Sequence, residues 1–238
     1  MATADGNPIV AIAAEAREFD GLLRHASSVS ELDWPVTFAR RAEIGGVAWI
    51  LSANGPGPRL AGAAADVAAR QVEPRAYIST GFCGALDPAL DACQVFVAST
   101  VEARDQGREF GSTMTNAETP HAQGRLLSVD RVAVTAAEKA ALWAEGSSVV
   151  EMEAAAVAER AERSETPFYC IRVVSDTARD EMPLDFNLYR DRDGRFSRGR
   201  IVAALLMRPA SFAGLMRLDA HCRRASTNLG DFLADCRF

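Results

Sequence analysis

The sequence predicts an α/β protein: a single three-layer αβα domain, residues 1–238, around a central sheet that is mixed and mostly parallel. Short apolar segments alternate with segments of helical periodicity, which is typical of strands joined by crossover helices. Most of the apolar segments are uninterrupted, as strands are when helices cover both faces of their sheet. The 238 residues, 48% of them hydrophobic, are enough to bury one substantial core.

In the first half of the chain, apolar segments bounded by turn residues predict strands. We place these strands at residues 8–13, 36–41, 47–52, 75–80 and 94–100. Residues 15–23 have apolar side chains at helical spacing, and an alanine-rich helix is expected from Pro58 or Arg59 to about Gln71. Pro58 suits the first position of that helix, where a missing N–H does little harm. The Gly-Gly pair at 45–46 predicts a hairpin between two of the strands.

The second half continues the alternation of strands and helices. We expect strands at residues 131–134, 149–151 and 168–175, and helices at 136–145 and 154–163. Residues 102–123 are polar and irregular, which predicts a long loop over the active face or at a subunit contact.

Residues 198–238 form a tail that differs in composition from the rest of the chain. Its seven arginines and three aspartates give it a charge of +4. Because the whole chain has a net charge of −6, the preceding residues together carry −10. Apolar runs at 201–207 and 212–218 lie within this basic background and predict a helical tail. Such helices pack on their own domain or on a second subunit, or they lie at a membrane surface.

The composition argues against several classes of protein. A net charge of −6 disfavours nucleic acid as a partner, because phosphate binding needs a basic surface. No apolar run is long enough to span a membrane, and residues 1–8 lack the basic segment of a secretory signal. The five cysteines form no CxxC pair, which is typical of free thiols in the cytoplasm. The three histidines are not spaced as metal ligands, so we expect neither a metal nor another cofactor.

Three carboxylates are candidates for a functional site: Glu18, Glu153 and Asp176. Each falls where a predicted strand ends or a helix begins, and ligands of open α/β sheets bind beyond the carboxyl ends of the strands. Segments far apart in the sequence could therefore bring all three to one pocket. Each acid taken singly also has a structural interpretation. Glu18 could be an exposed charge on a helix, Glu153 could stabilise a helix start, and Asp176 could cap a helix together with Ser175.

Four segments carry a family resemblance: residues 79–88 (STGFCGALDP), 150–154 (VEMEA), 171–176 (IRVVSD) and 15–19. In that order, they resemble the glycine-rich ligand loop, the ribose-binding motif, the purine-facing strand end and the first strand–helix turn of one superfamily. This is the superfamily of purine nucleoside phosphorylases and methylthioadenosine/S-adenosylhomocysteine nucleosidases. The segments occur in family order over roughly residues 8–180. The resemblance implies a nucleoside phosphorylase-like fold and cleavage of an N-glycosidic bond.

The resemblance also implies a role for each carboxylate. Breaking an N-glycosidic bond builds positive charge on the ribose and negative charge on the base, so a carboxylate beside the sugar stabilises the transition state. By the resemblance, Glu153 binds the 2′- and 3′-hydroxyls, Asp176 protonates the purine near N7, and Glu18 activates water. Met152 packs against the sugar, and Ser175 orients Asp176.

We expect further residues of these motifs, together with Arg59, to contact the substrate. The predicted substrate-binding residues are Ser79, Thr80, Gly81, Phe82, Glu151, Met152, Ser175 and Arg59. Arg59, near a predicted helix N-terminus, is placed to receive an anion or else is an exposed helix residue, and Met152 alternatively packs in the core. Phe82 or Trp143 is the candidate to stack on the purine.

The nucleophile is predicted less directly. Ser79 and Phe82 stand where the hexameric phosphorylases have the arginine and the serine that hold phosphate, and neither can play those roles. This difference favours water as the nucleophile, with phosphate possible as a co-substrate.

The tail shows a second resemblance, at residues 193–195 (DGR), 203–209 and 215–218 (LMRL). These segments resemble the hopanoid-associated phosphorylase subgroup, which is linked to removing adenine from an adenosine whose 5′ carbon carries a triterpene. We therefore expect adenine release from a 5′-substituted adenosine by a cytoplasmic homo-oligomer, with peripheral membrane contact through the tail. The alternatives are a phosphate-dependent phosphorylase that forms ribose-1-phosphate, and a non-catalytic nucleoside-binding module.

Overall fold

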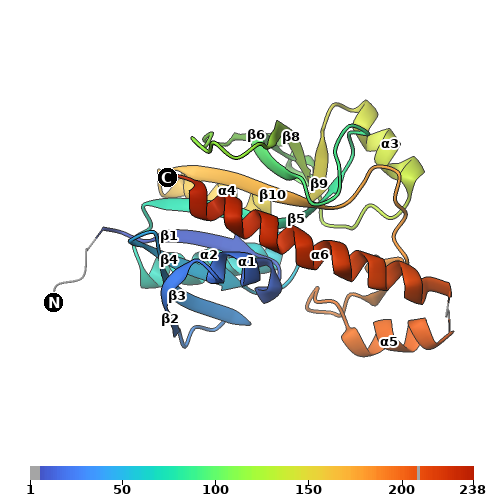
Figure 1. The fold of residues 1–238 in the computed structure, drawn as a ribbon, viewed down its shortest axis with the longest axis horizontal. Helices are drawn as coiled ribbons and strands as arrows, with labels where there is room; N and C mark the ends of the chain where they lie inside the picture. The colour runs from blue at the N-terminus through green and yellow to red at the C-terminus, as the bar shows by residue number, and fades with distance from the viewer. Residues whose placement is uncertain (1–5, 208–209) are drawn as a thin grey trace.

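The structure is a computed structural model that describes residues 6–207 and 210–238. In this part of the chain the strands are β1 (Ile9–Ala13), β2 (Ala26–Glu31), β3 (Phe38–Ile44), β4 (Val47–Ala53), β5 (Ala76–Ala85), β6 (Val95–Ala103), β7 (Arg108–Gly111), β8 (Ala122–Ser128), β9 (Val149–Glu151) and β10 (Phe168–Asp176). They form one sheet in the order β10-β6-β8-β9-β5-β1-β4-β3-β2, whose strands are labelled in Figure 1. β7, which has no label there, pairs with β6.

The sheet is open at one side and closed at the other. β10 pairs with β5 as well as with β6, so β5, β10, β6, β8 and β9 form a ring. Among the described strands, five pairings are parallel and five are antiparallel. The α/β fold with a mixed sheet is confirmed, although the parallel pairings are no majority.

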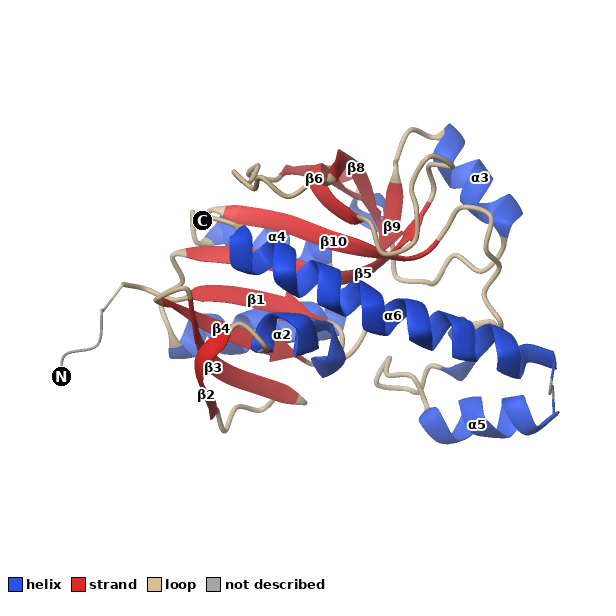
Figure 2. Ribbon diagram, viewed as in Figure 1, coloured by secondary structure: helices blue, strands red, loops and turns tan. Residues whose placement is uncertain are grey.

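Helices cover both faces of the sheet (Figure 2). The helices are α1 (Asp20–Leu23), α2 (Pro58–Gln71), α3 (Ala136–Ala144), α4 (Ala154–Arg163), α5 (Arg198–Met207) and α6 (Ala210–Asp235), with short 3-10 helices η1 (Ala16–Phe19), η2 (Arg104–Gln106) and η3 (Phe186–Tyr189). α2 and α4 share a core with Val10 and Ile12 of β1, whereas α6 packs in the core that holds the alternate β1 residues. None of the described helices is long and apolar enough to cross a membrane.

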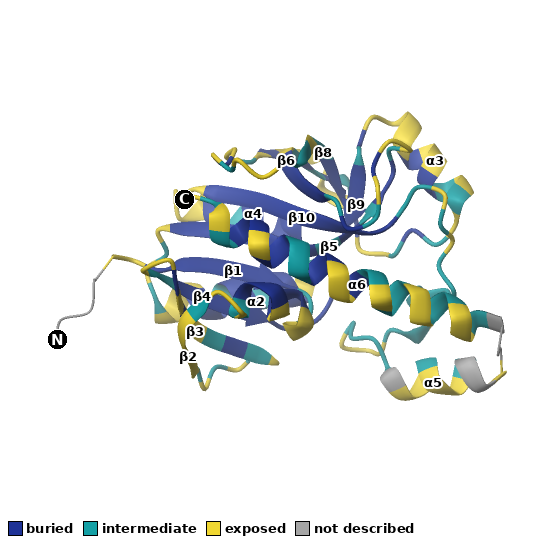
Figure 3. Ribbon diagram, in the orientation of Figure 1, coloured by how far each residue is buried: buried dark blue, intermediate teal, exposed yellow. Residues whose placement is uncertain are grey.

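Two glycines fix the position of α6 across one face. A Cβ atom on Gly21 of α1 would lie 1.9 Å from the carbonyl oxygen of Ser226, and one on Gly230 would lie 2.1 Å from the carbonyl carbon of Gly21. The two helices therefore approach closely enough for backbone contact, which no other residue permits at these positions. Figure 3 shows that the central strands β1, β5 and β10 are largely buried, whereas much of α5 and of the adjoining part of α6 is exposed.

Most elements lie within a few residues of the predicted positions, but three predictions were incomplete or wrong. β2 (ASSVSE) is a largely exposed edge strand with little apolar pattern to reveal it. Residues 131–134 are not a strand; the strand is β8, nine residues earlier at its start. β8 was not predicted because its first half contains polar residues. In the folded protein its Arg125 pairs with Glu102 of β6 and Glu109 of β7.

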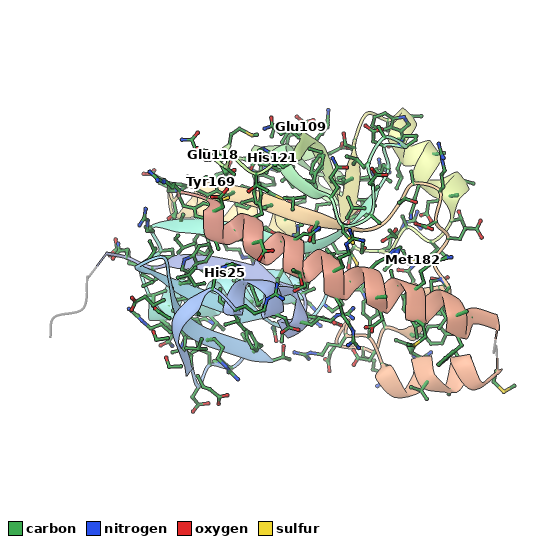
Figure 4. The ribbon with its side chains drawn as sticks, viewed as in Figure 1. His25, Glu109, Glu118, His121, Tyr169 and Met182 are labelled. Carbon is green, nitrogen blue, oxygen red and sulfur yellow. The ribbon has the colours of Figure 1, made fainter. Side chains whose placement is uncertain are left out.

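The predicted loop at 102–123 also differs from the structure. It contains the end of β6, η2, β7 and the beginning of β8. Just after β7 it passes the amino end of β10, where the Thr113 amide donates to the carbonyl of Phe168. Figure 4 shows Glu118 and His121 beside Tyr169 at this end of the sheet, with Met182 far along the molecule. The segment therefore does not cover the candidate active face; a subunit contact stays a prediction.

Candidate active site

A cavity of about 490 Å³ lies at the carboxyl ends of β5, β9 and β10. It is lined from β5 by Phe82, from β9 by Glu151 and from β10 by Asp176, and the start of α6 covers it. Glu18, Glu153 and Asp176 all line this one cavity, and each is at most 5% exposed. Three acids from distant parts of the sequence thus converge at the edge of the sheet where α/β proteins bind their ligands.

Arg172 of β10 is fully buried and lies beneath these acids. Its Nη2 donates to Glu151 Oε2 and, at 2.6 Å, to the hydroxyl of Ser79. Its Nη1 donates to the carbonyl of Thr80 at 2.8 Å and lies 3.5 Å from Glu153 Oε2. A buried charge is tolerated only when it is paired and hydrogen-bonded, so this guanidinium and the two carboxylates depend on one another.

Glu151 and Glu153 hold the start of α4 in different ways. Glu151 Oε2 accepts the backbone N–H of Glu153 at 2.8 Å and that of Ala154 at 2.9 Å, where a helix N-terminus favours an anion. Glu153 Oε1 accepts the N–H of Gly57 at 2.8 Å. The turn that precedes α2 is thereby fixed to the cavity.

Glu18 is held by backbone donors and needs a glycine beside it. Its Oε1 accepts the N–H of Phe82 at 2.7 Å, and its Oε2 accepts the N–H of Glu15 at 2.7 Å. Gly81 has a φ of +123°, and a Cβ there would lie 2.3 Å from Glu18 Oε1. The glycine therefore allows both the positive φ at this position of β5 and the close approach of the Glu18 carboxylate.

Asp176 is held at both carboxyl oxygens. Ser175 Oγ lies 2.6 Å from Oδ1, and the ammonium of Lys139, on α3, lies 2.5 Å from Oδ2. The sequence did not indicate Lys139, because one lysine in an amphipathic helix is normally exposed. Arg172 did leave a signal: it is a lone charge inside an otherwise apolar strand.

Burial raises the pKa of all three acids. For Glu18, the hydrogen bonds from Glu15 and Phe82 only partly offset this effect. For Asp176, burial outweighs the lowering of its pKa by Lys139 and Ser175. For Glu153, burial and the neighbouring charge of Glu151 raise the pKa to about 8. The raised pKa therefore favours the protonated form of each acid, and for Glu153 it places the titration near neutral pH.

The other predicted binding residues divide into two groups. Phe82, Glu151, Met152 and Ser175 line the cavity. Ser79, Thr80 and Gly81 lie behind its wall, where the first two hold Arg172.

Arg59 does not reach the cavity. It is exposed and donates to the carbonyl of Asp193. Trp143 is likewise absent from the lining and is 37% exposed, so it is not the purine-stacking residue. The prediction for Arg59 failed because its side chain turns toward solvent and the Asp193 carbonyl, although Gly57 at the start of the same helix is held at the cavity by Glu153.

A further part of the cavity was not predicted. One wall consists of apolar side chains contributed by residues 182–218: Met182, Phe186, Phe196, Ile201, Leu215, Met216 and Leu218. Arg17 lines the cavity beside them, paired with Glu15 at 2.9 Å and with Asp219 of α6 at 3.4 Å. The cavity thus has a floor of acids and a separate apolar wall.

Comparisons with known proteins identify a matching family model and similar folds. Residues 102–206 match the family model described as the phosphorylase superfamily. The fold is similar to that of the methylthioadenosine/S-adenosylhomocysteine nucleosidase of Neisseria meningitidis, with a TM-score of 0.72 and 22% identity over 96% of this chain and 97% of that one. It is also similar to the S-adenosylhomocysteine nucleosidase of Streptococcus pyogenes, with a TM-score of 0.72 and 19% identity over 99% and 100% of the two chains.

Replacing Arg172 with Met should destabilise the protein by roughly 3–5 kcal/mol, because it leaves two buried carboxylates without their cation. Urea denaturation measures the loss. The control is Arg163→Met, which removes an exposed ion pair with Glu159 and should cost about 0–1 kcal/mol. Equal losses in the two variants would show that Arg172 is not the centre of this network.

The raised pKa of Glu153 predicts a pH-dependent effect of Glu153→Gln. Between the ordinary value of 4.5 and about 8, the folded protein holds a proton that the unfolded chain has released, so this group's contribution to stability falls as pH rises. Glutamine does not titrate. The stability of Glu153→Gln relative to the wild type should therefore improve from pH 5 to pH 8 by at least ~1.4 kcal/mol, the energy of one pKa unit.

Urea denaturation at both pH values tests this expectation, with Glu73→Gln, at an exposed position, as the control. The control should show no such change with pH. If the stability of Glu153→Gln relative to the wild type stayed constant or fell as pH rises, the raised pKa of Glu153 would be contradicted.

Proposed function

We propose, from its match to the phosphorylase superfamily model over residues 102–206 and from the geometry of its cavity, that this chain cleaves the N-glycosidic bond of a purine nucleoside. The superfamily was predicted from four sequence motifs, and the family match over residues 102–206 and the similar fold support it. The observation that carries the proposed activity is the convergence of Glu18, Glu153 and Asp176 on one cavity beside Arg172.

In the proposed reaction, the bond between ribose C1′ and the purine nitrogen breaks and its electron pair passes to the base. Asp176 gives a proton to the base, and the raised pKa of its buried carboxyl supports this role as an acid. Glu153 faces the positive charge that develops on the ribose. Because that charge exists only in the transition state, its attraction to the ionised form of Glu153 accelerates the reaction.

Water is the nucleophile in this proposal. Its oxygen forms the new bond to C1′, and its proton passes to Glu18, whose raised pKa makes it a better base. Both terminal nitrogens of the fully buried Arg172 are engaged by Glu151, Ser79 and the Thr80 carbonyl, so they are not free to hold phosphate. Arg17 supports the second candidate, phosphorolysis, because it is a cation in the cavity that a phosphate could reach.

The apolar wall supports a 5′-substituted adenosine whose substituent is large and apolar, such as a triterpene. A wall without charges favours such a group over one that carries an ammonium and a carboxylate, which would have to be desolvated there. An adenosyl-hopanoid is consistent with this wall and with the resemblance of the tail. Phe82, Phe186 and Phe196 are the cavity aromatics that supply candidates to stack on the purine.

The tail also supports peripheral contact with a membrane. Of the eight large apolar side chains that are exposed in the described structure, five lie between residues 188 and 216: Leu188, Val202, Met207, Phe212 and Met216. Exposed arginines such as Arg200 and Arg217 accompany them. Apolar side chains with basic neighbours suit the interface of an anionic bilayer. Arg208 and Pro209 of the tail motif lie outside the described residues.

Two further proposals concern assembly and location. A homo-oligomer is proposed because a second copy of the chain could cover the same exposed side chains. All five cysteines have free thiols, which supports a reducing, cytoplasmic location.

The activity is tested by following the release of free adenine from methylthioadenosine, S-adenosylhomocysteine and a lipid-linked adenosine. We expect release in phosphate-free buffer, with the highest kcat/KM for the apolar substituent. Asp176→Asn should lower kcat by about 10²–10⁴-fold, the usual contribution of a general acid, whereas Asp105→Asn, at an exposed position remote from the cavity, should not. Strict dependence on phosphate would favour phosphorolysis, and full activity of Asp176→Asn would remove the proposed acid.

Membrane contact is tested by sedimentation with vesicles that contain anionic phospholipid. The double variant Met207→Ser/Phe212→Ser should lose most of the binding, because it removes two exposed apolar side chains from the tail. The matched control, Val29→Ser/Trp143→Ser, removes exposed apolar side chains elsewhere and should bind normally. If the first variant changed the oligomeric state in light scattering instead of vesicle binding, the tail would be a subunit interface.

A further inference from the structure

Lys139 is a fully buried lysine on α3, a helix that otherwise buries little besides Leu142. Its ammonium donates to Asp176 Oδ2 at 2.5 Å, to the carbonyl of Thr177 at 2.8 Å and to the carbonyl of Asp180 at 3.0 Å. All three of its N–H groups are therefore used. Burying an ammonium costs several kcal/mol before pairing, and an apolar side chain could fill the same space without that cost.

The three bonds of Lys139 fix the chain just after β10. Thr177 is tied back to Asp180, whose Oδ2 accepts the Thr177 N–H at 2.9 Å and the Thr177 hydroxyl at 2.7 Å. Lys139 joins this small loop to α3 through the two carbonyls. The carboxyl of Asp176, at the beginning of the loop, is thus held on a rigid support.

The other oxygen of Asp176 belongs to an arrangement that accepts two protonation states. Ser175 Oγ lies 2.6 Å from Asp176 Oδ1 and 3.1 Å from the carbonyl oxygen of Cys83. When Asp176 is ionised, the serine hydroxyl can donate to it. When Asp176 is neutral, its own O–H can donate to Ser175 Oγ, and the hydroxyl turns to the Cys83 carbonyl. No heavy atom needs to move, provided that the carboxyl stays in place.

We infer that Lys139 is a positioning residue for the proposed general acid Asp176, which it holds in place through Oδ2 while the proton leaves from Oδ1. This inference rests on the proposed function. The positive charge of Lys139 also opposes the effect of burial on the pKa of Asp176. It therefore favours release of the proton at the moment when the base departs.

The test compares two substrates that differ in their need for an acid. A purine leaving group must be protonated as it departs, whereas p-nitrophenolate, released from p-nitrophenyl β-D-ribofuranoside, needs no proton. Lys139→Met should lower kcat about 10- to 100-fold for the purine nucleoside and less than about threefold for the nitrophenyl riboside. Asp176→Asn should show the same split between substrates, with a larger loss on the nucleoside.

Two further variants keep the comparison decisive. Thr177→Val removes a hydrogen bond of the same loop but leaves Lys139 in place, so it should affect both substrates equally and slightly. Lys139→Gln retains a donor without the charge, and it replaces Lys139→Met if that variant does not fold. Parallel losses on both substrates in the Lys139 variants would show that the lysine only stabilises the fold and would overturn the inference.

The same experiment separates this inference from the proposed function. A wild-type protein that releases no purine from any nucleoside would overturn the proposed activity, and the assignment of Lys139 with it. A wild-type protein that is active, combined with Lys139 variants that keep their full rate on the nucleoside, would overturn the role of Lys139 alone.

Discussion

The buried guanidinium of Arg172 is the interaction on which the arrangement of the site depends. It lies inside β10, donates to Ser79 and Thr80 of β5, and meets Glu151, the last residue of β9. One cation in the middle of β10 therefore joins the middle of β5 to the carboxyl end of β9. Carboxylates taken out of water normally become neutral. The positive charge of Arg172 favours the ionised form of the neighbouring Glu151 and Glu153 and reduces the repulsion between them.

Within this network, neighbouring acids have different tasks. Glu151 Oε2 is used by Arg172 and by two backbone N–H groups at the start of α4, so this carboxylate mainly holds the structure. Glu153 has weaker support, from the N–H of Gly57 and a longer contact with Arg172. It is accordingly the carboxylate whose pKa rises to about 8. The acid with the less stable charge is the one that gains most when a cation develops beside it.

The sequence was sufficient for the parts of the fold that depend on apolar periodicity, and for the acids at the ends of the strands. It was insufficient where tertiary contacts decide the outcome. β8 has polar residues that are compatible with a strand only because Arg125 finds Glu102 and Glu109. Lys139 looks like any exposed lysine until α3 is packed against the end of β10. For Arg59 the sequence predicted a contact with the substrate that the structure does not show. Its position at the start of a helix does not determine the direction of its side chain.

The two parts of the cavity are held by different kinds of contact, and this difference bears on how such an enzyme acquires its substrate. The acid floor belongs to strands that are buried on both faces, where a change of one side chain disturbs several others. The apolar wall is attached by polar contacts, such as those between Asn187 and the backbone of Val132 or between Arg17 and Asp219, and by the later turns of α6, which pack in the core through residues such as Leu229. Side chains on the wall can therefore change without disturbing the acids. It follows that selectivity for the 5′ substituent can vary while the chemistry of bond cleavage stays the same, because the groups that would perform the two tasks share a cavity but little of their support.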